Sequence, residues 1–591
     1  MTRPTTMCEA FQQTAARNAD RIALRTPGGA TELTWRQYAD RVRAIAGGLA
    51  GLGVRAGDTV AIMMTNRPEF HLVDVAAMHL GATCFSIYNT LPAEQVGYLL
   101  RNSGSRVVAV EQQFAAKVLT ATADTKVERV VCVDGDVVGT LPLAELESPG
   151  DRDPDFDFDA AWRAVRPDDV LTLIYTSGTT GNPKGVELTH CNMLAELYAG
   201  NAVLQVGPQD RIVSYLPHAH AADRWGSHYA SLAFGVQLTC VADHRTILAA
   251  LTDARPTAFG AVPQIWYKIQ TGIETRIAEE KSPVKRRLAS WAIGAGRRVS
   301  KNTLLGQPVP PLAAVQHRLA DRLVLSKLRG ALGLDQVRAA ITGAAPIAPD
   351  TLEFMTAIGV TVCECWGMSE LTSMATLNRP GAVRIGTVGT AMDGVELKLA
   401  DDGELLARGD IVMKGYRNEP EKTAEAIDAD GWMHSGDIAT IDDEGYVRIV
   451  DRKKELIINA AGKNMSPANI ESMVHAAGAL VGNVVAIGDN RPYNVALIVL
   501  DPDATASYAK QHGLADVSPA ALAADAGIHA AIAASVEAAN ARLARVEQIK
   551  KFTILPDAWE PGTDVLTPTM KLRRKPIAER YAAEIEALYA R

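Results

Sequence analysis

Short apolar runs alternate with longer amphipathic stretches through the first 370 residues of the chain. The apolar runs predict buried strands at 60–64, 107–110, 130–133, 170–175, 238–241, 339–341 and 360–363. Between them lie predicted helices, one starting at Thr34 to Tyr38 and ending near Gly51 and Gly53, another over 69–81. Strands that alternate with helices predict a mostly parallel, doubly wound sheet with helices on both faces.

The pattern changes from about residue 383 to short alternating runs separated by turns. Asp402-Gly403, Asp430-Gly431 and Glu444-Gly445 mark these turns, which predicts hairpins or a small barrel. Beyond residue 456 the chain is mixed, with Ala-rich helices over 519–546 and a terminal helix from Pro576. We therefore predict an α/β protein. A large N-terminal domain combines doubly wound sheets with a small β-barrel-like region, and a small α+β C-terminal domain follows.

Composition narrows the class of protein. A chain of 591 residues exceeds one ordinary core, and 47% hydrophobic with 22% charged residues is typical of a soluble globular protein. A net charge of −8 gives no field that would attract nucleic acid. Neither a signal peptide nor an apolar run long enough to span a bilayer is evident. Seven scattered cysteines suit a reducing cytosol, and Cys363 with Cys365 fits a strand better than a metal site. The prediction is a cytoplasmic protein.

One segment, 281–301, carries a cluster of basic residues around Leu288, Trp291 and Ile293. Its charges are Lys281, Lys285, Arg286, Arg287, Arg297, Arg298 and Lys301. A basic amphipathic segment can lie on an anionic membrane surface, at the inner face of the membrane for a cytoplasmic protein. A solvated helix face is the plainer interpretation, and we favour it.

A loop suited to polyphosphate follows the strand at 170–175. The stretch reads LTLIYTSGTTGNPKG, so glycines, hydroxyls and Lys184 come together within nine residues. Gly lets backbone N–H groups approach oxygens, hydroxyls donate hydrogen bonds, and Lys adds a mobile positive charge. Pro183 precedes the lysine and Gly185 follows it, so the loop is not a Walker A motif.

Three further motifs contain residues suited to binding or catalysis. The first is Trp366 to Glu370 (WGMSE), which follows an apolar run, as does the upstream glycine turn Gly343-Ala344-Ala345-Pro346. Open α/β sheets bind ligands at the carboxyl ends of their strands. The second motif is Asp437 together with Arg452 in the run DRKKE. Asp437 can accept hydrogen bonds from the hydroxyls of a ribose, and Arg452 can donate to the same sugar. The third motif is LTPTMKLRR, residues 566–574, with Lys571 near its centre.

These four motifs, in this order over residues 171 to 574, resemble the adenylate-forming superfamily of acyl-CoA synthetases, peptide-synthetase adenylation domains and luciferases. DRKKELIINAAGKN, LTPTMKLRR and the length are most similar to bacterial long-chain fatty acyl-CoA synthetases. The resemblance implies a large domain over 1–452 and a small mobile domain over 453–591, with a hinge near Lys454. It implies that ATP, Mg²⁺, coenzyme A and a fatty acid are the bound species.

The resemblance also implies a role for each matching residue. Lys571 is the catalytic lysine, Glu370 and Thr176 hold Mg²⁺, and Gly462 lines the path of coenzyme A. The implied nucleotide contacts are Thr176, Ser177, Gly178, Thr179, Thr180, Gly181, Lys184, Gly343, Ala344, Ala345, Trp366, Gly367, Met368, Ser369, Asp437, Arg452 and Lys571.

Two histidines in the segment SYLPHAHAADR admit several interpretations. His218 and Asp223 have the His-x₄-Asp spacing that acyltransferases use, and His218 with His220 could form a metal pair with Asp243-His244 downstream. Long-chain acyl-CoA synthetases carry a similar segment whose histidine matches His220, which we include among the catalytic candidates. They more often have an apolar residue where His218 stands.

The sequence therefore predicts an AMP-forming long-chain fatty acid–CoA ligase. Three alternatives stay open: a fatty acyl-AMP ligase that delivers to a carrier protein, a non-catalytic nucleotide-binding protein, and a His218/Asp223 acyltransferase that needs no ATP. The sequence leaves the acyl chain length and the oligomeric state open, a dimer included.

Overall fold

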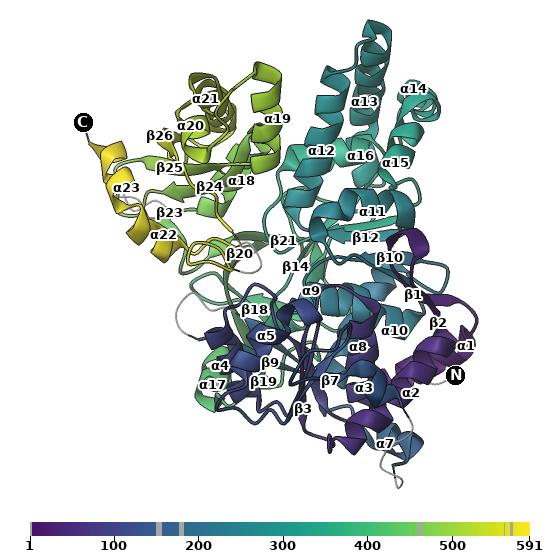
Figure 1. Ribbon diagram of the computed structural model, residues 1–591. Coiled ribbons are helices and arrows are strands. Elements are labelled where there is room, and N and C mark those ends of the chain that lie inside the picture. Colours follow the sequence, from purple (N-terminus) through teal and green to yellow (C-terminus); the bar gives the residue numbers. More distant parts are fainter. Residues whose placement is uncertain are drawn as a thin grey trace.

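The computed structural model describes residues 3–148, 156–176, 182–458, 464–560, 562–567 and 571–590. Two mixed sheets form the centre of the larger, N-terminal part (Figure 1). The first has eight strands in the order β19-β9-β8-β4-β3-β5-β6-β7. Its strands are β3 (Thr59–Met63), β4 (Thr83–Ser86), β5 (Val107–Val110), β6 (Arg129–Cys132), β7 (Leu141–Pro142), β8 (Val170–Thr176), β9 (Lys184–Thr189) and β19 (Gly415–Tyr416). From β8 to β7 the neighbouring strands are parallel, whereas β9 and β19 pair antiparallel.

Helices cover both faces of this sheet, as the alternation of strands and helices predicts. Successive side chains of a strand point to opposite faces. Val60 and Ile62 of β3 accordingly pack into the core formed with α1 (Met7–Arg17), α2 (Trp35–Gly51), α3 (Pro68–His79) and α8 (His190–Leu204). Ala61 and Met63 pack into the opposite core with α4 (Ala93–Ser103) and α5 (Gln112–Ala121). The doubly wound arrangement is confirmed.

The second mixed sheet has the order β12-β13-β14-β15-β16. Its strands are β12 (Ala258–Ala261), β13 (Ala339–Thr342), β14 (Val362–Trp366), β15 (Thr376–Leu377) and β16 (Thr390–Ala391). The first three are parallel, so their carboxyl ends meet at one edge. A smaller sheet joins β10 (Arg211–Ser214), β11 (Gln237–Cys240), β1 (Ile22–Arg25) and β2 (Glu32–Thr34). The strand expected at 360–363 begins two residues later and continues to Trp366, so Cys363 and Cys365 lie in a strand as predicted.

The predicted hairpin region is an antiparallel sheet in the order β17-β18-β20-β21. Its strands are β17 (Glu396–Leu399), β18 (Glu404–Arg408), β20 (Met433–Ile441) and β21 (Val447–Arg452). Gly403 and Gly445 take the left-handed conformation, with φ of +84° and +83°, at the turns that join β17 to β18 and β20 to β21. This sheet supplies one wall of the site described below.

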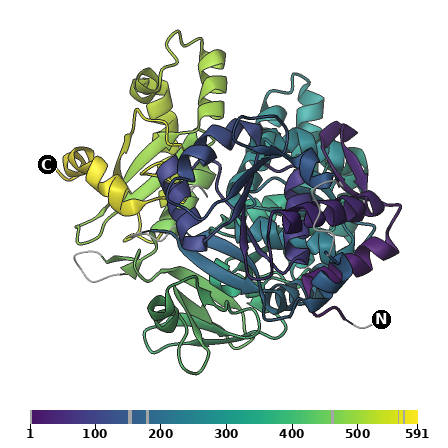
Figure 2. The same cartoon turned by 60° about the horizontal axis from the view of Figure 1, so that its bottom comes forward.

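The part beyond residue 456 has cores of its own around β24 (Val481–Ile487), β25 (Asn494–Leu500) and β26 (Ile549–Ile554). It also holds the short pair β22 (Ile457–Ile458) and β23 (Asn464–Met465). Its helices are α18 (Pro467–Ala477), α19 (Pro502–His512), α20 (Pro519–Ala524), α21 (Ala526–Asn540), α22 (Arg574–Arg580) and α23 (Ala582–Tyr589). Figures 1 and 2 show this part beside the larger one. The predicted helices are present, but the Ala-rich pair ends at Asn540, before residue 546.

Candidate active site

A cavity of about 2430 Å³ is lined by residues of both parts of the chain. All seventeen described residues that the sequence singles out as site, hinge or acyltransferase candidates line it: Thr176, Lys184, His218, His220, Asp223, Gly343, Ala344, Ala345, Trp366, Gly367, Met368, Ser369, Glu370, Asp437, Arg452, Lys454 and Lys571. Ser177, Gly178, Thr179, Thr180, Gly181 and Gly462 lie outside the described residues.

Strand ends position one side of this cavity. Gly343 follows β13 directly and Gly367 follows the neighbouring parallel strand β14. A Cβ at Gly367 would lie 1.9 Å from the carbonyl oxygen of Ser373, so only glycine fits there. Ala344 has a φ of +69°, a conformation that costs an alanine energy and that proteins retain mainly at functional sites.

A carboxylate, a phenol and an ammonium are grouped on the same wall. The Tyr416 hydroxyl donates to Oε1 of Glu370 at 2.8 Å, and Nζ of Lys184 lies 3.9 Å from the centre of the Tyr416 ring. Burial lowers the pKa of the Lys184 amine, and the charge of Glu370 opposes that shift. An ammonium over an aromatic ring and near a carboxylate has its position restricted. Sequence reasoning missed Tyr416 because its only link to Glu370 is spatial.

The pair Asp437 and Arg452 faces the same cavity from β20 and β21. The two residues are register partners across the strands, and Nε of Arg452 lies 3.2 Å from Oδ1 of Asp437. The Trp366 indole N–H donates to the other carboxylate oxygen at 2.7 Å. Burial raises the pKa of Asp437, while Arg452 and the Trp366 hydrogen bond act in the opposite direction. Two predicted motifs, 71 residues apart in the chain, therefore meet at one carboxylate.

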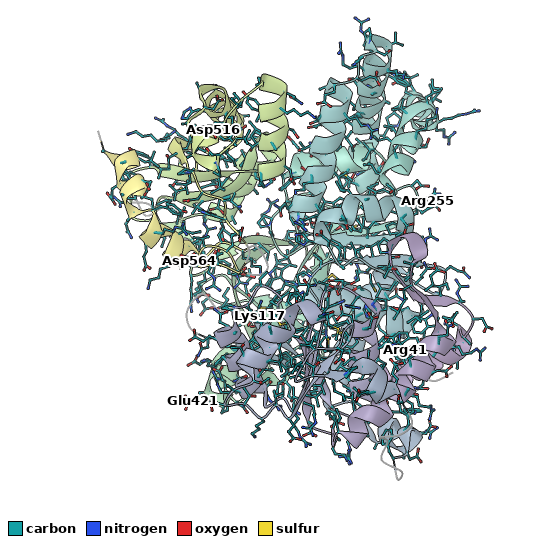
Figure 3. The ribbon with its side chains drawn as sticks, viewed as in Figure 1. Arg41, Lys117, Arg255, Glu421, Asp516 and Asp564 are labelled. Carbon is teal, nitrogen blue, oxygen red and sulfur yellow. The ribbon has the colours of Figure 1, made fainter. Side chains whose placement is uncertain are left out.

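Lys571 enters the cavity from a turn of the C-terminal part. Leu566 and Leu572 form an antiparallel bridge at the base of the turn, and the Lys571 N–H donates to Oγ1 of Thr567 at 2.9 Å. The side chain is accessible to solvent through the open cavity, but the protein groups around the cavity displace part of the water near its amine. This desolvation lowers the pKa of the Lys571 amine, the positive charge of Arg452 lowers it further, and the negative charge of Asp437 raises it. Figure 3 labels Asp564, which precedes this turn on the C-terminal part.

Arg574 fixes the turn that carries Lys571. Its guanidinium donates to both carboxylate oxygens of Glu471 at 2.6 and 2.9 Å and to Oε2 of Glu455 at 3.2 Å. A planar fork bound by two carboxylates allows little rotation. The basic end of the 566–574 segment was a signal for this role, but the sequence did not indicate the carboxylate partners.

The two histidines have different environments. Nδ1 of His218 lies 2.6 Å from Oδ2 of Asp223, and its ring stacks on Phe70 with centroids 3.6 Å apart. His218 and Asp223 therefore form the predicted pair, although the imidazole is buried in a polar and aromatic cluster. Nδ1 of His220 accepts from the N–H of Ala222 at 3.1 Å, and burial lowers its pKa to about 4, with the positive charge of Lys571 adding to this shift. His220 is therefore neutral near pH 7.

The metal hypothesis for these histidines finds no support. The described residues contain no group of three or more His, Cys, Asp or Glu side chains arranged to hold a metal ion. Asp243, the carboxylate proposed downstream, has both oxygens bound by Arg245 at 2.8 to 3.1 Å.

A buried ionic network holds the segment that follows His220. Arg224 donates to Oδ2 of Asp74 at 2.5 Å, to Thr172 at 2.5 Å and to Tyr229 at 2.8 Å, and His228 bonds the other oxygen of Asp74 at 2.8 Å. Burial alone would raise the pKa of Asp74, but Arg224 and His228 together hold it below its usual range. The network fixes one cavity wall, the π-helix η3 (Arg224–Tyr229), and no sequence motif predicted it.

Beyond the polar groups the cavity has an apolar extension. The side chains between α8, η3, α10 (Ala230–Phe234) and β10 include Leu197, Val206, Ile212, Trp225 and Phe234. A charged end and an apolar extension in one cavity suit a ligand that carries a polar head on an aliphatic body.

Comparisons with known proteins agree with this geometry. Residues 11–417 match the model of the AMP-binding enzyme family, and residues 454–591 match the AMP-binding enzyme C-terminal domain. A Mycobacterium tuberculosis protein provisionally named fatty-acid–CoA ligase fadD11 is 55% identical over 452 residues, which are 76% of this chain and 79% of that protein. The long-chain-fatty-acid–CoA ligase FadD15 of Mycobacterium bovis is 36% identical over 95% of this chain and 92% of its own length.

Among solved structures, the Mycobacterium tuberculosis fatty acyl CoA synthetase aligns with a TM-score of 0.62 and 25% identity, covering 98% of this chain and 99% of that one. The match of the family model over more than half of the chain, together with the 36% identity to FadD15, shows its family. The chain belongs to the AMP-binding enzyme family.

Proposed function

We propose that this chain is an AMP-forming long-chain fatty acid–CoA ligase. One observation carries the proposal: Lys571 of the C-terminal part reaches a cavity whose wall holds Glu370, Asp437 and Arg452, and an apolar extension continues from it. The names of relatives aligned over most of the chain support a fatty acid as the acid and coenzyme A as the acceptor.

In the first half-reaction the carboxylate of the fatty acid attacks the α-phosphorus of ATP, and pyrophosphate leaves with the electron pair of the broken P–O bond. Both reactants are anions that repel each other. The ammonium of Lys571 can contact both and stabilise the charge of the transition state. Asp437 and Arg452 fit the ribose, since a carboxylate accepts hydroxyl protons and a guanidinium donates. The loop 176–184 fits the β- and γ-phosphates, with Lys184 as its positive charge.

Magnesium fits the donors at Glu370 and Thr176. Mg²⁺ prefers hard oxygen ligands. The Glu370 carboxylate lines the cavity with one oxygen hydrogen-bonded to Tyr416, and the Thr176 hydroxyl stands at the end of β8. A bound Mg²⁺ would neutralise part of the triphosphate charge.

The second half-reaction needs a different arrangement of the same cavity. The thiolate of coenzyme A attacks the acyl carbonyl carbon, and AMP leaves with its phosphate oxygen. We propose that the C-terminal part rotates near Lys454, at the boundary of domains 1–452 and 453–591. The rotation withdraws Lys571 and brings Gly462 to the path of coenzyme A. Rotation about a hinge lets one cavity serve two reactions in turn.

Pyrophosphate release by the purified protein tests the proposal. The assay uses Mg·ATP with palmitate or octanoate, each with and without coenzyme A. Release that requires a fatty acid and rises with coenzyme A is the expected result. Release indifferent to coenzyme A would instead identify an acyl-AMP ligase, and no release with any acid would refute the proposal.

Lys571→Ala tests the division of labour between the two half-reactions. The variant is expected to lose adenylate formation and to keep the transfer of a supplied acyl-adenylate to coenzyme A. Lys550→Ala is the matched control, because Lys550 is an exposed lysine of the C-terminal part that does not line the cavity and whose ammonium donates to Gln548 at 2.7 Å. Equal loss of both half-reactions in Lys571→Ala would refute the role given to this lysine.

A further inference from the structure

A helical arm stands out at the edge of the N-terminal part (Figure 1). We define the arm as residues 281–330. It contains α13 (Pro283–Leu304), α14 (Pro311–Ala320), the π-helix η5 (Asp321–Leu325) and the start of α15 (Ser326–Leu332). Figure 1 shows α13 rising at the edge of the molecule with α14 beside it.

Small side chains form the inner side of the arm. Ala292 and Ala295 of α13 pack against Ala320 and Leu325 in a small core. A Cβ on Gly296 would lie 2.0 Å from the carbonyl oxygen of Ala357, so α13 lies directly on α16 (Pro349–Ala357). The inner side is therefore filled, and the outer side of the arm is left to solvent.

Large apolar side chains gather on the outer side of the arm. Of the thirteen exposed large apolar residues among those the structure describes, six belong to this arm, with exposures between 38% and 74%: Val284, Leu288, Leu312, Val315, Leu319 and Leu323. Leu312, Val315, Leu319 and Leu323 follow one another at spacings of three and four, which places them along one side of α14 and of the π-helix η5 that continues it. Single exposed apolar residues are ordinary, but a continuous row marks an interaction surface.

The same arm concentrates positive charge. Residues 281–330 hold eleven Lys or Arg residues and one acidic residue, Asp321, although the whole chain has a net charge of −8. Ten of the eleven are exposed: Lys281, Lys285, Arg286, Arg287, Arg297, Arg298, Lys301, Arg318, Arg322 and Lys327. Arg329, the partly buried one, takes Asp321 as its partner at 2.8 Å. Arg318 and Arg322, beside the apolar row, have no ion-pair partner within the part of the chain that the structure describes. Figure 3 shows side chains projecting outward from α13 and α14.

We propose that this arm docks the protein on an anionic lipid bilayer. Positive side chains meet lipid phosphates, while the row Leu312, Val315, Leu319 and Leu323 enters the boundary between headgroups and acyl chains. The positive charge of the arm by itself would also suit binding to nucleic acid. A phosphate backbone, however, offers no apolar surface against which the exposed leucines and valines could pack. A second copy of the arm would bring two strongly positive surfaces together, which repel.

Docking at a bilayer would place the cavity where fatty acids partition, and this benefit rests on the proposed function. The binding of the arm to the bilayer does not depend on that function. No helix within the described ranges combines the length and the apolar character that a membrane crossing requires. Attachment through the arm needs no such helix, because it is a contact with the membrane surface.

Vesicle co-sedimentation of the full chain tests the arm. The vesicles are phosphatidylcholine alone or phosphatidylcholine mixed with phosphatidylglycerol, at low and at high salt. Three proteins are compared: wild type, Arg318→Gln/Arg322→Gln and Leu312→Ser/Leu319→Ser. The matched control is Val517→Ser/Lys550→Gln, which removes one exposed apolar and one exposed basic residue from the C-terminal part.

Wild type and the control are expected to bind the anionic vesicles and to be released from them by salt. Each removed charge should weaken binding about fivefold at low salt. The double serine variant should bind more weakly at both salt concentrations, because apolar contact is not screened. Pyrophosphate release with octanoate should stay unchanged in all variants, which shows that they fold.

Failure of wild type to bind anionic vesicles, or arm variants that bind as well as the control, would overturn the proposal. So would equal affinity for a DNA duplex, or a dimer that the double serine variant dissociates. Inactivity of the wild-type protein in the pyrophosphate assay would overturn the proposed function alone, because vesicle binding requires no catalysis.

Discussion

Removing the hydroxyl of Tyr416 tests whether Glu370 is held for catalysis. Tyr416→Phe keeps the ring beneath Lys184 and deletes only the hydrogen bond of 2.8 Å to Oε1 of Glu370. A hydrogen bond to a charged group contributes about 1.5 to 3 kcal/mol. Because Glu370 lines an open cavity, water can replace part of that contact, so we expect the lower half of the range. About 1.5 to 2 kcal/mol corresponds to roughly a 10- to 30-fold lower kcat/KM for pyrophosphate release.

Tyr446→Phe is the matched control for this change. The Tyr446 hydroxyl donates to the carbonyl oxygen of Ala382, also at 2.8 Å, and Arg384 lies over its ring at 4.0 Å. The deleted groups are thus alike, but Tyr446 does not line the cavity. Pyrophosphate release should fall only in Tyr416→Phe. An effect below twofold in that variant, or an equal loss in Tyr446→Phe, would refute a specific role for the Tyr416–Glu370 contact.

Three further predictions concern Lys571, the arginine that fixes its turn, and an ion pair between the two parts of the chain. The kcat/KM of adenylation should fall as the pH rises through the lowered pKa of Lys571, because the ammonium stabilises the charge of the transition state and the neutral amine does not. A pH–rate profile whose activity falls only at the ordinary lysine pKa would contradict this prediction. Arg574→Met removes the ion-pair partner of Glu471 and should lower the free energy of unfolding by about 2 kcal/mol in a urea titration. This loss is smaller than that expected for a fully buried pair, because both side chains keep some exposure. A matching loss in Glu471→Gln would support the pairing, and unchanged stability in Arg574→Met would exclude it. Arg542→Gln removes a two-bond contact of 2.6 and 3.0 Å with Asp350 across the two parts, and should slow adenylation by no more than about fivefold, the limit for an exposed pair; a larger loss would show that the contact does more than align the parts.

Much of the fold followed from local patterns in the sequence. The strand at 107–110 was predicted with its exact bounds, and 170–175 within one residue, because apolar runs of that length leave few alternatives. Strands such as β9, β10 and β12 were not predicted, because their residues lack a distinctive period. The segment at 281–301 was recognised as basic and amphipathic, but a solvated helix face was favoured for it, because the exposed apolar row on α14 and η5 that lies beside it was not predicted.

The pairing of β20 with β21 shows why the contact between Asp437 and Arg452 could not be predicted from the sequence. In the hairpin of β20 and β21, Thr440 pairs with Arg448, and an unbroken register would place Asp437 opposite Asp451. A bulge between Ile438 and Ala439 moves the pairing by one residue, so that Asp437 faces Arg452 instead. A slip of one residue exchanges a repulsive carboxylate pair for an ion pair.

The sequence by itself determined the order of elements, the four motifs and the chemical type of each candidate group, because these depend on neighbours within a few residues. The tertiary structure decided which groups meet. Tyr416 reaches Glu370 across 46 positions, and Arg224 reaches Asp74 across 150. Such contacts depend on sheet order, register and burial, and local sequence patterns carry no direct record of these because packing brings together residues that are distant along the chain.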